Sequence, residues 1–163
     1  MTFAEKLRAW IPLHENPVSC ALHFLGGYLF VFALAVPLSF ASLDVGGVAL
    51  TPARVAFAAL AIYMVSLEWT AGLLSAALLL PTLLAAEQLA TLPHGTAAAL
   101  ALGVMVFRFS IVVGAHALFE KKFHGLSLGG PVLFVVEPVY LFTLAMFRLG
   151  AKQELQARVR AAP

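Results

Sequence analysis

Residues 18–40 read VSCALHFLGGYLFVFALAVPLSF, a continuous and mainly apolar stretch without Asp, Glu, Lys or Arg. A helix that crosses a lipid bilayer needs about 20 such residues in a row. Three further apolar stretches follow at about 52–67, 71–90 and 97–119, separated by short polar turns. The sequence therefore predicts an all-α integral membrane protein with about four transmembrane helices.

The overall composition supports a lipid environment. Of the 163 residues, 62% are hydrophobic and only 11% are charged, whereas a soluble domain is nearer half apolar and a quarter charged. So few charges cannot cover a water-exposed surface, and a net charge of +2 is too small to indicate a nucleic-acid partner. The lone Cys20 excludes an intramolecular disulfide. Because nothing resembles a linker, we expect residues 1–163 to form a single domain.

The N-terminal residues 1–16 have the pattern of an amphipathic segment that lies at a membrane interface. Phe3, Leu7 and Trp10 recur at helical spacing beside basic residues, as in an interfacial helix. Asn16 with a proline directly after it is typical of a helix start, with asparagine as the N-cap and proline at the first helical position.

The last apolar stretch, 131–147, is short and carries Glu137 followed by proline near its middle. Under the positive-inside rule, Lys6 and Arg8 place the N-terminus in the cytosol. Four crossings then return the basic loop after residue 120 to the cytosol, whereas a fifth would move the basic C-terminal tail outside. We therefore favour an interfacial or re-entrant helix at 131–147 over a fifth span. The Ala- and Leu-rich make-up favours a bacterial inner membrane over the endoplasmic reticulum.

This topology predicts that histidines remote in the sequence meet at the cytosolic face. His14 and His23 lie at the start of the first span, and His116 and Glu120 lie at the end of the fourth. Residues four apart share one helix face, so His116 and Glu120 suit two metal ligands, or a ligand and the carboxylate that orients it. Three imidazoles and a carboxylate suit Fe(II), Zn(II) or Mn(II). The alternative is that these histidines form hydrogen bonds only with the backbone or with lipid headgroups and bind no metal. We interpret His94, on the opposite face, in this second way.

Two other polar residues, Arg108 and Glu137, have two interpretations each. Arg108 in the fourth span either forms an interhelical ion pair with Glu87 of the third, which we favour, or binds a substrate carboxylate. Glu137 either supports the metal site or caps the last helix. His124 is near the predicted site but lies in a Gly-rich loop.

Two histidine motifs occur together in this chain: His14-x-Asn16-Pro17 followed by His23, and Ala115-His116-Ala117-Leu118-Phe119-Glu120-Lys121. Further matches are Tyr63, Thr70-Ala71-Gly72-Leu73-Leu74 and Pro131-x-x-Phe134-x-x-Glu137. Over residues 14–150 the chain resembles the fungal 2-hydroxy fatty acid dioxygenases of α-oxidation and their bacterial relatives. It departs from the usual family pattern at Ala115, where glycine is usual, at His124, where proline is usual, and in a shorter loop before Pro131.

The resemblance implies a membrane enzyme that uses Fe(II) and O2 to shorten a long-chain 2-hydroxy fatty acid by one carbon. It implies that His14, His23 and His116 are the metal ligands. Glu120 would be a further ligand or the carboxylate that orients a ligand, and Asn16, Lys121 and Glu137 would be supporting residues. The predicted site is thus His14, His23 and His116 for the metal, Glu120, Lys121 and Asn16 for catalysis, and Arg108, Glu137 and His124 for substrate. Alternatives are another metal-dependent lipid or isoprenoid enzyme on this scaffold, and a non-enzymatic lipid-binding membrane protein.

Overall fold

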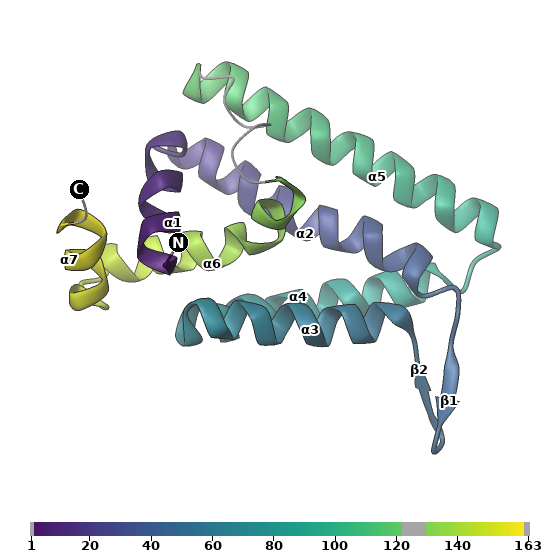
Figure 1. The fold of residues 1–163 in the computed structure, drawn as a ribbon. Coiled ribbons are helices and arrows are strands. Elements are labelled where there is room, and N and C mark those ends of the chain that lie inside the picture. Colours follow the sequence, from purple (N-terminus) through teal and green to yellow (C-terminus); the bar gives the residue numbers. More distant parts are fainter. Residues whose placement is uncertain (1, 122–129, 162–163) are drawn as a thin grey trace.

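The computed structural model describes residues 2–121 and 130–161, and it is predominantly helical (Figure 1). In chain order its elements are α1 (Phe3–Trp10), the 3-10 turn η1 (Ile11–Leu13), α2 (Pro17–Leu38), β1 (Leu43–Val45), β2 (Val48–Leu50), α3 (Pro52–Leu67), α4 (Trp69–Leu89), α5 (His94–Ala115), the π-helical turn η2 (His116–Glu120), α6 (Gly130–Arg148) and α7 (Gln153–Ala161). The predicted helical architecture is therefore confirmed, and the expected N-terminal and C-terminal helices are present.

Within the described residues, three helices are long and apolar enough to cross a membrane. They are α2, α4, and α5 continued by η2 from His94 to Glu120. The other predicted span, α3, is apolar but has only 16 residues. At about 1.5 Å per residue it is roughly 24 Å long, which is shorter than the hydrocarbon core of about 30 Å. The fourth crossing therefore stays a prediction.

Helix α2 is the central element of the fold. It packs along α5 on one side and along α4 and α6 on the other, while α3 pairs with α4 (Figure 1). Its first turn is capped by the Asn16 side chain, which accepts hydrogen bonds from the backbone N–H groups of Val18 and Ser19. The predicted cap and the helix start at Pro17 are confirmed.

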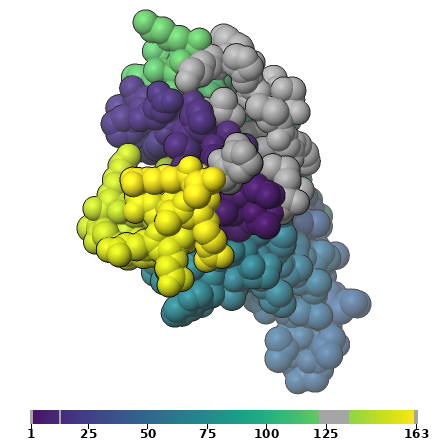
Figure 2. Space-filling model, turned by 60° about the vertical axis from the view of Figure 1, so that its left-hand side comes forward, coloured from purple at the N-terminus to yellow at the C-terminus, as the bar shows by residue number. Residues whose placement is uncertain are grey.

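The short helix α1 forms where the amphipathic pattern predicts it, but its apolar face is covered by protein. Leu7 and Trp10 are buried in a cluster with Val136 and Tyr140 of α6 and Val159 of α7. Figure 2 shows α1 and α7 side by side at one end of the molecule. The apolar stripe of α1 therefore packs against protein, and the position of this segment at a membrane interface stays a prediction.

The predicted turn after the first span is larger than expected, because it opens into an antiparallel hairpin of β1 and β2. The strands are joined by Gly46 and Gly47, which both have positive φ angles, of 63° and 82°. A two-residue hairpin turn with positive φ at both positions is of type I′, for which glycine is favoured.

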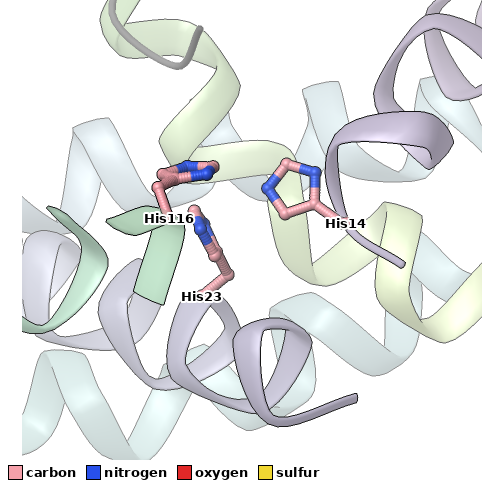
Figure 3. A group of neighbouring side chains, drawn as sticks. All are labelled: His14, His23 and His116. Carbon is pink, nitrogen blue, oxygen red and sulfur yellow. The ribbon is translucent and has the colours of Figure 1, made fainter. Parts of the chain in front are cut away.

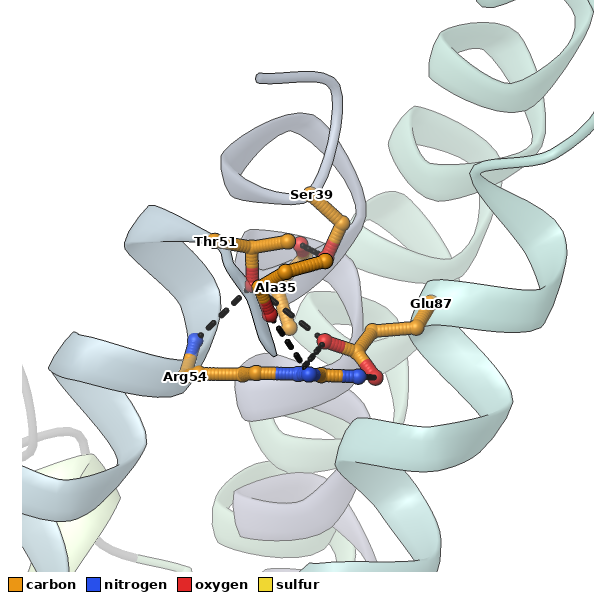
Figure 4. A network of polar contacts seen from close by, with 6 residues as sticks. Ala35, Ser39, Thr51, Arg54 and Glu87 are labelled. Carbon is orange, nitrogen blue, oxygen red and sulfur yellow. Dashed lines mark hydrogen bonds and ion pairs between the residues drawn. The ribbon is translucent and has the colours of Figure 1, made fainter. Parts of the chain in front are cut away.

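Glu87 forms an ion pair, but its partner differs from the predicted one. Its carboxylate accepts hydrogen bonds from Arg54 Nε at 2.7 Å and Arg54 Nη2 at 3.0 Å, and from Thr51 Oγ1 at 3.2 Å (Figure 4). Arg108 lies far along the bundle, where its Nε donates to the Gly26 carbonyl at 3.4 Å. The predicted pair of Arg108 with Glu87 was therefore wrong.

Candidate metal centre

Three histidines from separate segments meet at the end of the bundle that carries α1 and α7. His14 follows η1, His23 lies in the second turn of α2, and His116 opens η2 (Figure 3). Each offers a ring nitrogen, and these nitrogens lie within 4.8 Å of one another. The ring centroids are 4.4 Å apart for His14 and His23, 4.6 Å for His23 and His116, and 5.5 Å for His14 and His116. The predicted convergence of the three is confirmed.

The backbone and an aromatic ring hold His14. Its Nδ1–H donates to the carbonyl of Trp10 at 3.1 Å, because a carbonyl oxygen can only accept. The imidazole also stacks on the Trp10 indole, with centroids 3.9 Å apart and the planes inclined by 9°. Burial, reinforced by the nearby His23, lowers the pKa of His14 to about 3. The ring is therefore neutral at pH 7, with its Nε2 lone pair available.

A buried carboxylate holds His23. Its Nδ1 lies 3.0 Å from Glu137 Oε1, and both side chains are almost fully buried. Metal-binding histidines commonly donate the N–H that faces away from the metal to a carboxylate or a carbonyl, which sets the tautomer and the ring orientation. Of the two interpretations of Glu137, the structure favours the one in which it supports the histidine cluster.

His116 sits on a π-helical turn, a rare conformation that is frequently found at functional sites. At the end of this turn, the buried Glu120 accepts a hydrogen bond through Oε1 from the backbone N–H of Asn16 at 3.1 Å. This bond ties the segment that carries His116 to the start of α2, which carries His23. Glu120 is not part of the group of ligand atoms found among the described residues.

The donor atoms fit a divalent metal ion. His14 Nε2 and His23 Nε2 are buried, and neither has a hydrogen-bond partner within the described part of the chain. Buried polar atoms without a partner are rare and need an explanation. Neutral imidazole nitrogens suit zinc, copper, iron and nickel, so the cluster agrees with a metal centre without specifying the metal.

The remaining predicted residues lie at varied distances from this cluster. Arg108 is fully buried between α2 and α5, with its guanidinium against the rings of Phe30 and Phe109. Lys121 is exposed just beyond η2, and His124 lies outside the described residues. His94 stacks on Phe40 at the opposite end of the bundle, which agrees with its assignment as a structural residue.

Trp10 belongs to the histidine cluster, although the sequence did not identify it as a site residue. The sequence pattern places Trp10 in an apolar stripe, yet its backbone carbonyl accepts from His14 and its ring stacks on the imidazole. The four-residue spacing between Trp10 and His14 was the available signal, since it puts both residues on one face of a helical segment.

No family model, no curated protein and no solved structure matches this chain. The geometry of the histidine cluster, together with the motifs in the sequence, is therefore the basis for assigning a function.

Replacing Glu137 by alanine should weaken metal binding about 10- to 100-fold, the usual cost of removing a group that orients a ligand. The reason is that Glu137 is the only hydrogen-bond partner of His23 Nδ1 among the described residues. Titration of the purified metal-free protein with Fe(II) or Zn(II) measures the effect. Glu137→Gln keeps an acceptor oxygen and should bind more tightly than Glu137→Ala, whereas equal affinity of both variants and wild type would contradict this role.

Proposed function

We propose that this protein is a membrane-embedded, Fe(II)-dependent dioxygenase that shortens 2-hydroxy fatty acids by one carbon. The observation that supports this most is the pair of buried imidazoles whose Nε2 atoms lack partners and lie beside a third imidazole. The choice of iron and of the substrate rests on the resemblance of the two histidine motifs to the dioxygenases of α-oxidation.

In this proposal the bundle crosses the membrane four times, through α2, α3, α4 and α5. The centre lies at the cytosolic face, together with α1 and α7. Helix α6 is re-entrant, because it runs beside α2 and ends next to α7 at the same end of the bundle (Figure 1). Long-chain substrate enters from the lipid, and its carboxyl group stays at the level of the histidines.

The proposed reaction balances with one molecule of dioxygen. R–CH(OH)–COOH and O2 give R–COOH, CO2 and H2O. The bond between C1 and C2 breaks, C1 leaves as CO2, and C2 becomes the new carboxyl carbon. Bound Fe(II) supplies the redox chemistry with dioxygen.

The residues of the chain supply binding and orientation. His14, His23 and His116 would hold the iron, with the Trp10 carbonyl and Glu137 fixing two of the rings. Either of two cations would neutralise the substrate carboxylate: Lys121, which is exposed directly after η2, or Arg108, which is buried in α5.

The test is oxygen consumption by the detergent-purified, Fe(II)-loaded protein after addition of a long-chain 2-hydroxy fatty acid. We expect uptake that needs both the iron and the 2-hydroxyl group, with the unsubstituted fatty acid of equal length as the control. Bound iron without uptake would favour a different lipid or isoprenoid substrate. Neither iron nor uptake would favour a lipid-binding protein without enzymatic activity.

A further inference from the structure

The β1–β2 hairpin has one entirely apolar face. Leu43 pairs with Leu50 and Val45 pairs with Val48, while Asp44 pairs with Ala49 between them. Directly opposed residues of an antiparallel pair point to the same side, and sides alternate along each strand. The two leucine and valine pairs therefore share one face, and Asp44 lies on the other.

All four apolar side chains of this face are exposed. The exposed fractions are 72% for Leu43, 59% for Val45, 59% for Val48 and 39% for Leu50. Figures 1 and 2 show the hairpin projecting sideways from the end of the bundle opposite α1 and α7, and not continuing along the helix axes. If the helices cross a membrane, the hairpin thus extends over the lipid beside α3 and α4.

The base of the hairpin is held in place by hydrogen bonds. Arg54 Nη1 donates to the carbonyl of Ala49 at 2.6 Å, while the other nitrogens of its guanidinium bind Glu87 of α4 (Figure 4). Thr51 bonds the same carboxylate and caps α3. The base of the hairpin is therefore bonded to α3 through Arg54, and Arg54 is itself fixed by Glu87 of α4.

The size and continuity of this face favour lipid as its partner. A stable protein interface buries about 800 Å² on each side, which is more than four leucine and valine side chains offer. The face is continuous in sequence with α3, which begins two residues after Leu50 and exposes Val55 and Ile62. Because α3 is short for a span, its start needs support at the edge of the hydrocarbon region.

We propose that the β1–β2 hairpin is a membrane-interface anchor in the leaflet opposite the metal centre. Its face of Leu43, Val45, Val48 and Leu50 lies on the boundary between headgroups and acyl chains, and its Asp44 face points to water. The anchor holds the N-terminal end of α3 at the interface and thereby lets this short helix cross. The proposal rests on the four-crossing arrangement but not on the metal or the reaction.

Spin-label accessibility in phosphatidylcholine–phosphatidylglycerol nanodiscs tests the anchor. Single cysteines at Val45 and Val48 report the apolar face, and cysteines at Asp44 and Ala49 are matched controls on the other. Cys20→Ser removes the native thiol while keeping a hydrogen-bond donor for the His14 carbonyl, which Cys20 Sγ contacts at 3.2 Å. Oxygen is the apolar relaxation agent and a water-soluble nickel chelate is the polar one.

We expect the ratio of oxygen to nickel accessibility to be several-fold higher for Val45→Cys and Val48→Cys than for the two controls. Equal nickel accessibility on both faces would place the hairpin in water and overturn the proposal. Protection of the apolar face from both agents, with line broadening between labels, would identify a second copy as its partner and also overturn it. Iron content of the labelled variants is a separate readout, so failure of the proposed enzyme function does not affect this result.

Discussion

Alanine in place of His116 should abolish tight Fe(II) binding and, with it, oxygen uptake. The donor nitrogen of His116 lies within 4.8 Å of those of His14 and His23, so its removal leaves two of the three imidazoles of this cluster. Loss of a group that merely orients a ligand costs about 10- to 100-fold in affinity, and we expect loss of a ligand itself to exceed this range. The measurement is iron per protein after purification, together with a binding titration of the metal-free variant.

His94→Ala is the matched control for this experiment. His94 is also a helix-end histidine, but it stacks on Phe40 with ring centroids 4.4 Å apart, at the other end of the bundle. It should retain wild-type iron content. A His116→Ala protein with unchanged iron content and normal helicity by circular dichroism would remove His116 from the site.

The second large effect is expected at Gly72, where α4 packs directly against the backbone of α3. A Cβ atom at this position would clash with the carbonyl oxygen and carbon of Met64. Those are backbone atoms, which cannot move aside as a flexible side chain can, so the two helices must separate. Since overpacking typically costs 1–3 kcal/mol, we expect Gly72→Ala to lower the free energy of unfolding by about 3 kcal/mol, measured by denaturation in detergent.

Gly103→Ala serves as the control for Gly72→Ala. Gly103 lies in α5 with no atom within 4 Å of a Cβ built there, and alanine is favoured over glycine inside a helix by about 1 kcal/mol. This variant should be as stable as wild type or slightly more stable. Equal stability of Gly72→Ala and wild type would contradict the close packing of α3 on α4.

The sequence by itself determined most helix positions and the members of the histidine cluster. Helix α2 was predictable because its apolar length and its Asn16–Pro17 start act locally, within one segment of the chain. Successive spans run in opposite directions, so the start of the first span and the end of the fourth lie at the same membrane face. The convergence of His14, His23 and His116 followed from this arrangement. The length and end of each segment are local properties, so they can be read without knowledge of the packing.

The tertiary structure decided which side chains face one another. The pairing of His23 with Glu137, 114 residues away, and of Glu87 with Arg54 instead of Arg108, depends on how each helix is rotated about its axis. Helices that are apolar on all sides carry little information about that rotation. The same holds for the apolar stripe of α1, whose pattern does not distinguish a lipid surface from a protein surface, and only the packing against α6 and α7 does.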